Sequence, residues 1–433
     1  MNRSVSRYVL TNCRLIDGTG SEPSTNTTIV IEDERIAGIY YGGSAPFFPD
    51  AEILDLAGRT VMPGLIDAHT HITYHRDEYS LILQQMTESL ESNTLTAAAN
   101  ARHILEGGCT AIGDGACRGA IGSAIRDAVA SGLIKGPKVV AAGQMISGSG
   151  GIGDHTAAWG LHENQSYLGV TANGVDEIRS VVRAQLRRGV DWVKVTASGT
   201  PGNTWIGGDV QDLNYQEMRA AVAEAAKFGK SVHAHAHDRQ GIKDAVRAGV
   251  ISIHSGEFAD EVSLELMAKT GCVFVPTLSW LHFRVNDEYC RAYLRSGQTR
   301  EADVRKFKDA CQRAFDAGCR ATLKALEIGA TIGIGSDGAH VFPPYDVALE
   351  MKYIQDLGVP SLKVIQAGTQ NSAIAVGRRD RWGTVHVDKD ADLLIVDGDP
   401  SNDIAVLLDK SKLLGIMQSG RFVKRSVDMI RPS

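Results

Sequence analysis

The chain has 433 residues, of which 22% are charged and 43% hydrophobic, and its formal net charge is −6. This length exceeds one average domain, and the composition is that of an ordinary globular protein. The acidic balance excludes the basic surface of a protein that binds nucleic acid or an anionic membrane. Because we find no membrane-spanning apolar run and no signal segment near the N-terminus, we expect a cytoplasmic protein.

The two ends of the chain share a pattern of short strands. In 7–58 and again after residue 383, apolar and polar residues alternate between Gly, Asn and Asp turn residues. We therefore predict that residues 1–60 and 380–433 form one small β-sandwich domain. The alternative is two unrelated flaps.

Between the two ends, candidate strands alternate with candidate helices. The strands are expected at 62–71, 109–114, 137–143, 190–197, 230–236, 250–254, 271–276 and 330–336. Asn214 and Glu217 form a capping box before one helix, and Gly249 is a typical helix end. Eight strands alternating with helices predict an α/β fold, a (β/α)8 TIM barrel over residues 61–379, with its chemistry at the C-terminal ends of the strands.

The first predicted strand ends in the sequence DAHTHI, which supplies His69 and His71. In an extended strand, residues two apart lie on the same face. Neutral imidazoles on one face are good ligands for a divalent metal. The pair therefore indicates half of a metal site.

Lys194 stands between two valines in the fourth predicted strand, VDWVKVTASG. Burying its ammonium group among apolar residues is costly. Either the side chain reaches solvent or a carboxylate partner, or the uncharged amine is carboxylated and becomes an anionic ligand that bridges two metal ions.

The remaining strand ends carry further candidate ligands. His233, His235 and His237 share a face of the fifth strand, but they span ~13 Å at ~3.3 Å per residue, so they cannot all bind one ion. The sixth strand offers His254 or Ser255, and the eighth ends in Asp337.

Several motifs in order give the chain a clear resemblance: PGLIDAHTHI, DWVKVTASG, HAHDRQGIKDAVRAG, SIHSGEF and GIGSDG. Together they resemble the amidohydrolase superfamily, in the branch of imidazolonepropionase-like, prolidase-like (Xaa-dipeptidase) and ochratoxin-type amidase proteins. The resemblance spans nearly the whole chain. It implies a homo-oligomer with one or two divalent ions, zinc first and Mn or Co as alternatives. The ligands it implies are His69, His71, carboxylated Lys194, His235, His254 and Asp337.

The sixth strand departs from the pattern of the superfamily. The usual IEHG reads Ile253-His254-Ser255-Gly256, so in straight register His254 takes the place of Glu and would point to the wrong side. Either a bulge turns His254 inward, or the second metal is weak or absent. We prefer His254 as a ligand. A second departure lies in GGIGDH, where His155 is displaced.

These residues predict a metal-dependent amidohydrolase that cleaves an amide or peptide-like C–N bond in a small molecule. The ion lowers the pKa of a water from ~15.7 toward ~7. Asp337 is expected to accept the proton of this water and return it to the leaving amine, while His237, or alternatively His155, stabilises the oxyanion. The alternatives are a carbamate, urea, lactone or cyclic-amide hydrolase of the same fold, and a non-catalytic metal-binding relative.

Overall fold

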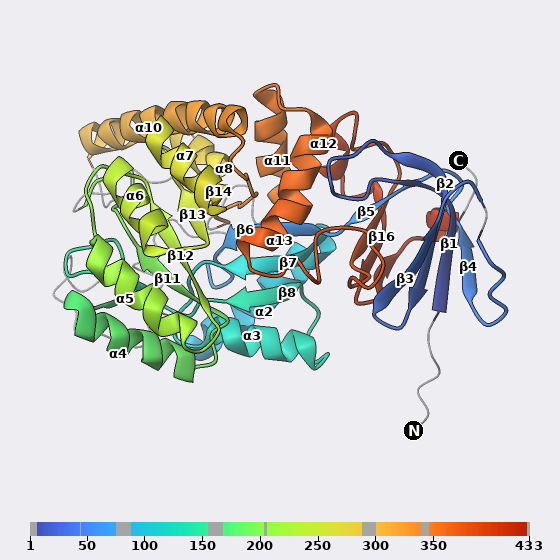
Figure 1. Ribbon diagram of the computed structural model, residues 1–433, viewed down its shortest axis with the longest axis horizontal. Coiled ribbons are helices and arrows are strands. Elements are labelled where there is room, and N and C mark those ends of the chain that lie inside the picture. The colour runs from blue at the N-terminus through green and yellow to red at the C-terminus, as the bar shows by residue number, and fades with distance from the viewer. Residues whose placement is uncertain are drawn as a thin grey trace.

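The computed structural model describes residues 7–43, 45–74, 88–154, 168–202, 206–287, 300–338 and 346–430. An α/β body, in which helices surround a ring of strands, lies beside a sheet built from both ends of the chain (Figure 1). No helix in the described ranges is long and apolar enough to cross a membrane.

Strands from both ends of the chain share one eight-stranded sheet with the path β17-β16-β15-β5-β1-β2-β3, and β4 pairs with β1 beside it. They are β1 (Arg7–Leu15), β2 (Ser24–Glu32), β3 (Arg35–Tyr40), β4 (Glu52–Asp55), β5 (Thr60–Pro63), β15 (Leu393–Val396), β16 (Leu413–Gln418) and β17 (Arg421–Arg425). Strand β5 is bonded to β1 on one side and to β15 on the other. The expected union of the two ends is therefore present, but the β-sandwich is not confirmed, because β5 joins the strands into one sheet. The domain boundaries at 60/61 and 379/380 stay a prediction.

Seven of the eight expected barrel strands form, together with two short strands that the sequence did not indicate, β9 and β10. The strands are β6 (Leu65–Thr70), β7 (Cys109–Asp114), β8 (Lys138–Ala141), β9 (Met145–Ser147), β10 (Gly169–Thr171), β11 (Trp192–Thr196), β12 (Ser231–Ala236), β13 (Ser252–Ser255) and β14 (Val273–Val275). They form two parallel sheets, β6-β7-β8 and β10-β9-β11-β12-β13-β14. The chain is thus TIM-barrel-like, as its alternating pattern predicted.

The helices cover the outside of this ring (Figure 1). They are α2 (Leu90–Glu106), α3 (Ile121–Ala130), α4 (Gly174–Arg187), α5 (Tyr215–Ala226), α6 (Arg239–Ala248), α7 (Glu261–Thr270), α8 (Leu278–Val285), α10 (Glu301–Ile328), α11 (Val347–Asp356), α12 (Ser361–Gln366) and α13 (Ser372–Ala375). A π-helical turn, η1 (Ala367–Asn371), joins α12 to α13, and the 3-10 turns η2 (Ile404–Leu407) and η3 (Val427–Ile430) lie near the C-terminus. The Asn214–Glu217 capping box is confirmed at α5, and Gly249 ends α6 with a φ of +100°.

The eighth expected strand, 330–336, is not a regular strand, and this corrects the prediction of a closed barrel. The segment forms only isolated bridges to its neighbours within the described chain, Phe274 with Ile332 and Thr70 with Gly338. Its glycines explain the difference. A Cβ at Gly335 would lie 2.7 Å from Val275 Cγ1 and 2.8 Å from the Cβ of His69, so no larger residue fits, and glycine weakens strand pairing. The gap between β8 and β11 is likewise spanned by a bond from Asp191 N to Ala141 O at 2.7 Å rather than by a ladder.

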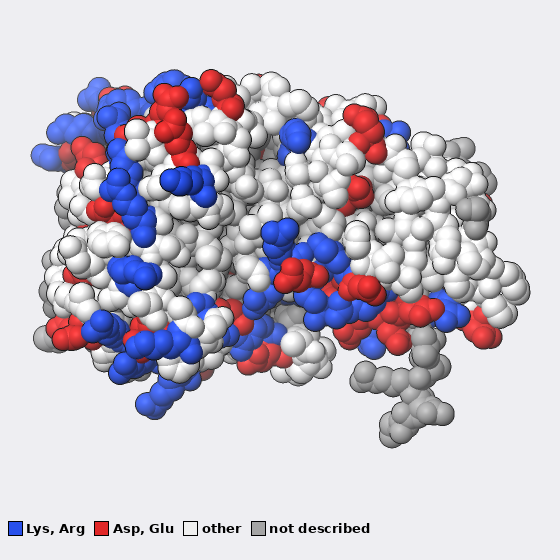
Figure 2. All heavy atoms as spheres, viewed as in Figure 1, with Lys and Arg blue, Asp and Glu red and all other residues white. Residues whose placement is uncertain are grey.

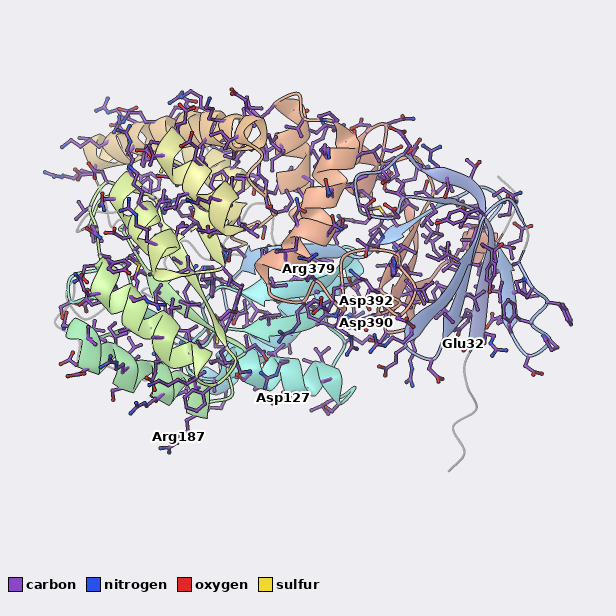
Figure 3. All side chains as sticks on the ribbon, viewed as in Figure 1. Glu32, Asp127, Arg187, Arg379, Asp390 and Asp392 are labelled. Carbon is purple, nitrogen blue, oxygen red and sulfur yellow. The ribbon has the colours of Figure 1, made fainter. Side chains whose placement is uncertain are left out.

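Charged side chains fasten the terminal sheet to the barrel. Lys138, at the start of β8, donates to Asp390 Oδ2 at 2.8 Å and to Asp392 Oδ2 at 2.7 Å. Arg381 donates to Asp390 Oδ1 at 2.7 Å. Figure 3 labels the two aspartates where the barrel meets the sheet, and Figure 2 shows acidic and basic residues interleaved over this region.

Candidate metal centre

Three predicted ligands, His69, His71 and Asp337, meet at the C-terminal ends of the first and last barrel segments. The Nε2 atoms of both histidines lie 3.2 Å from Asp337 Oδ1, and all three residues are buried. Nδ1 of His71 lies 2.9 Å from Ala116 O, and this contact keeps a proton on Nδ1 and leaves Nε2 as the nitrogen that faces Asp337. The three side chains thus present two imidazole nitrogens and a carboxylate oxygen to one point.

Two glycines give the His69 ring its place. A Cβ at Gly115 would lie 2.4 Å from His69 Cε1, and a Cβ at Gly335 would lie 2.8 Å from His69 Cβ. Because real Cβ atoms do not approach so closely, the backbone on both sides of the ring must remain glycine. The ring position is therefore fixed by backbone packing rather than by a flexible neighbour.

Asp337 is held to the first strand by its backbone and by its neighbour Ser336. Asp337 N donates to His69 O at 2.8 Å, and its φ of +48° is unusual for a residue other than glycine. Ser336 donates its N at 3.0 Å and its Oγ at 2.5 Å to the Asp67 carboxylate, which also accepts from His69 N at 3.1 Å. These bonds set Asp337 at a strained backbone position, as is common at functional sites.

Lys194 is 1% exposed and has no carboxylate within 4.0 Å among the described residues. Of the alternatives that the sequence left open, Lys194 therefore neither reaches solvent nor pairs with a carboxylate. Its Nζ lies 3.2 Å from His254 Nδ1. The same His254 Nδ1 lies 2.8 Å from His69 Nδ1 and 3.3 Å from His233 Nδ1. Four nitrogen atoms therefore converge in one buried space.

His254 points into the barrel without a bulge. The β12–β13 ladder pairs His235 with His254 and records no register shift, while Ile253 packs in the outer hydrophobic core. Ser255 faces away from the cluster, with its Oγ 3.1 Å from Thr277 Oγ1 and a φ of +84°. The expectation that straight register would point the imidazole outward is therefore wrong, because the inward face of β13 holds Ser252 and His254.

Burial sets the protonation states of this cluster. Burial, aided by the nearby Lys194 amine, lowers the pKa of His69 to about 3. Burial also lowers the pKa of Lys194 to about 7. At Asp337 burial favours the neutral acid, but His69 and His71 outweigh it and hold the pKa well below its usual range. Neutral imidazoles, an ionised carboxylate and a partly uncharged amine are the forms that bind metals or accept carboxylation.

Three histidines occupy different depths, as expected: His233 and His235 of β12, and His237 just after it. His233 lies deepest and stacks on Trp192 with ring centroids 3.6 Å apart. His235 is half-buried, and its Nε2 lies 3.2 Å from Thr200 Oγ1. The ring of His237, just after the strand, lies edge to face with that of His235 at 4.5 Å. His155 lies outside the described residues.

Sequence reasoning missed Glu257, whose side chain is 1% exposed and accepts a hydrogen bond from His237 Nδ1. Its only sequence signal is its place in SIHSGEF, just after the sixth strand. Sequence reasoning also missed Trp280 of α8, which stacks near His237 with ring centroids 6.5 Å apart.

A cavity of about 870 Å³ opens beside the ends of β11, β12 and β13. Its walls include Pro201, Asp238, Arg239, Phe258 and Phe307. Asp238 directly follows His237 and Phe258 directly follows Glu257. Space for a small organic molecule is thus lined by the residues that directly follow His237 and Glu257.

Comparisons with known proteins point the same way. The sequence model of the Amidohydrolase family matches residues 60–423. The ochratoxinase of Aspergillus niger is 29% identical over 429 residues, which cover 95% of this chain and 85% of that protein. An imidazolonepropionase of Symbiobacterium thermophilum is 24% identical over 400 residues, covering 87% and 84%.

Solved structures agree with the sequence comparisons. The crystal structure of Aspergillus niger ochratoxinase superposes with a TM-score of 0.83 and 25% identity, covering 99% of each chain. A Xaa-Pro dipeptidase with methionine bound in its active site superposes with a TM-score of 0.84 and 27% identity, covering 97% of this chain and all of that one.

Proposed function

The chain belongs to the amidohydrolase family, and from that premise we propose how its own residues perform the reaction. It is a metal-dependent hydrolase that acts on carbon–nitrogen bonds of small molecules. In our proposal six residues hold one or two divalent ions: His69, His71, Lys194 as its carboxylated form, His235, His254 and Asp337.

Five members of the donor set lie together in a way that fits such ions, while Nε2 of the sixth, His235, lies 3.2 Å from Thr200 Oγ1. His69, His71 and Asp337 present their ligand atoms within 4.8 Å of one another. At His254 Nδ1, three nitrogen neighbours lie within 3.3 Å, and one imidazole nitrogen can satisfy only one hydrogen bond. A cation, or a carboxylate on Lys194, would resolve this crowding. Nitrogen and oxygen donors suit Zn, Mn or Co, and zinc is our first choice.

Asp337 is the proposed general base and acid. The metal would supply Lewis acidity, which lowers the pKa of a water toward ~7 and polarises the scissile carbonyl. Asp337, ionised and fixed by its bond to His69 O, is placed to take the proton of the attacking water and pass it to the leaving amine.

His237 is the proposed group that stabilises the oxyanion. Its Nε2 is buried and has no hydrogen-bond partner among the described residues. The ring lies beside His235, and the next residue in the sequence, Asp238, lines the cavity. His155 remains the alternative for this role.

The proposed substrate is a small amide, such as an N-acyl amino acid, a dipeptide or a xenobiotic amide. The names of the ochratoxinase and of the Xaa-Pro dipeptidase support this class. A carbamate, urea, lactone or cyclic amide is the alternative within the same fold. We also expect a homo-oligomer, which light scattering can check.

The buried His69–His71–Asp337 cluster carries the proposal, and metal analysis joined to a substrate screen tests it. Protein purified without chelators should hold close to two divalent ions per chain if Lys194 and His254 complete a second site, and close to one if they do not. The screen covers N-acyl amino acids, dipeptides and carbamates. Protein that binds metal but hydrolyses none of them would support the non-catalytic metal-binding relative, and protein that does neither would overturn the proposal.

A further inference from the structure

The contact between His237 and Glu257 joins the ends of two adjacent strands. His237 follows β12 and Glu257 follows β13. Nδ1 of His237 donates to Glu257 Oε2, and the two side chains are 0% and 1% exposed. The backbone of His237 is fixed as well, because its N donates to Ser198 Oγ at 2.7 Å and its O accepts from Phe258 N at 3.3 Å.

Two atoms of this pair have no partner. His237 Nε2 and Glu257 Oε1 are buried and make no hydrogen bond within the described part of the chain. Buried polar atoms are almost always paired, so an exception calls for an explanation. A substrate atom that arrives beside the ligand cluster would supply the missing partner for Nε2.

Glu257 has no Lys or Arg within 4.0 Å among the described residues, so the imidazole is its only charged or chargeable contact there. A buried carboxylate without a cation is unfavourable for stability. A hydrogen bond that only stabilises the fold does not require a carboxylate, because a neutral side chain can accept it as well. An acceptor on Nδ1 does have a functional effect. It stops the ring from flipping and keeps Nε2, rather than a carbon, at the position where it lacks a partner.

We propose that Glu257 is a positioning residue, which acts through His237 by fixing the orientation of its ring toward the substrate. The inference rests on the proposed role of His237. The arrangement parallels that of His71, whose Nδ1 is fixed by Ala116 O, but at His237 a side chain rather than the backbone does the fixing.

The first test compares Glu257→Gln with Glu257→Leu on the best substrate from the screen. Glutamine keeps an acceptor of the same shape, whereas leucine removes it. We expect Glu257→Leu to lower kcat by about 10–100-fold with little change in KM or metal content, and Glu257→Gln to keep most of kcat. Glu224→Leu is the matched control, since Glu224 is a buried carboxylate that pairs with Arg183 and Lys227 at the outer helices. It should change the Tm and leave kcat unaltered.

A double-mutant cycle with His237→Asn shows whether Glu257 acts through His237. Adding Glu257→Leu to His237→Asn should lower kcat no further. Independent, additive losses would overturn the inference, as would a Glu257→Leu variant with full kcat. Loss of kcat in parallel with metal or Tm would also overturn it, because that pattern marks a merely structural role.

A spectroscopic measurement separates the inference from the proposed function. The ring signals of His237 in nitrogen-15-labelled protein are those that vanish in His237→Asn. The hydrogen-bonded Nδ1 signal should move in Glu257→Leu and remain in Glu257→Gln. If His237→Asn keeps full kcat, the proposed role of His237 fails and the positioning role fails with it, although the signal still moves. If His237→Asn loses kcat and Glu257→Leu does not, only the positioning role fails.

Discussion

Charged side chains are paired at the N-terminal ends of the barrel strands, whereas buried polar groups at the C-terminal ends lack partners among the described residues. At the N-terminal ends, Asp191 receives Arg126 at 2.9 Å, Arg378 at 3.6 Å and Lys230 at 4.0 Å, and these residues lie at or near a cavity of about 620 Å³. At the C-terminal ends, nitrogen atoms crowd together around His254, and His237 Nε2 lacks a partner. Paired charges stabilise the fold, whereas unpaired buried groups are unfavourable unless they bind something. The difference separates the stabilising end from the reactive end.

The largest effect should follow from Asp337→Asn at the reactive end. The amide keeps an oxygen donor for the metal but cannot accept the proton of the water, so kcat should fall by ~10²–10⁴ while most of the metal remains. Steady-state kinetics and metal analysis on the same preparation measure both. An active Asp337→Asn variant would show that the base lies elsewhere.

Lys194→Ala should remove metal and activity together, because the proposed carboxylated amine bridges two ions. Short carboxylic acids added to this variant should restore part of both, since they can occupy the place of the missing carboxylate. Metal content and rate are followed against acid concentration. Acids that restore nothing would count against a carboxylated lysine.

His254→Ala and Ser255→Ala test which residue of the sixth strand binds metal. His254 faces the cluster and Ser255 faces Thr277, so only His254→Ala should reduce the number of bound ions, from close to two to close to one. Elemental analysis of both variants decides this. If Ser255→Ala rather than His254→Ala changes the number of metal ions per chain, Ser255 and not His254 is the ligand.

Lys138→Met should lower the stability of the protein without changing its activity. It therefore tests the contrast from the side of the paired charges. It leaves the largely buried Asp392 without its cation, while Asp390 keeps Arg381 at 2.7 Å. The free energy of unfolding should drop by about 1–3 kcal/mol, as for a buried charged group left unpaired. Denaturant titration measures the loss, and kcat of the folded variant should match the wild type.

A pH-dependent effect on stability concerns Glu350 of α11, whose carboxylate accepts from Leu278 N at 2.8 Å and Ser279 N at 2.6 Å at the start of α8. Burial raises the pKa of Glu350 from 4.5 to about 8. A raised folded-state pKa favours the fold through the neutral acid, so this contribution is complete below pH 4.5 and is lost as the pH rises through 8. The stability of the wild type relative to Glu350→Gln should therefore fall between pH 5 and 8, by at most ~1.4 kcal/mol per pH unit. A difference that does not vary with pH would contradict the shift.

Local patterns were predictable from the sequence. The HxH pair and the helix caps at Asn214 and Gly249 each depend on neighbours along the chain, and each local structure formed as its pattern indicated. The resemblance in ordered motifs anticipated the family.

What the sequence did not yield depends on contacts between distant segments. Gly335 prevents a regular eighth strand because it packs on His69 and Val275. The direction of His254 depends on its ladder with β12, and the partner of His237 lies 20 residues away in Glu257. Both ends of the chain were expected together, but their joining through β5 into a single sheet follows from pairing on both of its sides.

The bonds between Ser336 and Asp67, described above as holding Asp337, also bear on how the protein is made. They span 269 residues, so the first strand with its ligands His69 and His71 cannot make these bonds until the last barrel segment has been synthesised. Contacts so distant in sequence form late, because closing a long loop costs entropy. Until then, His69 and His71 form only a partial site. Tight metal uptake should therefore accompany completion of the barrel, and a nascent chain stalled before Asp337 should bind metal weakly.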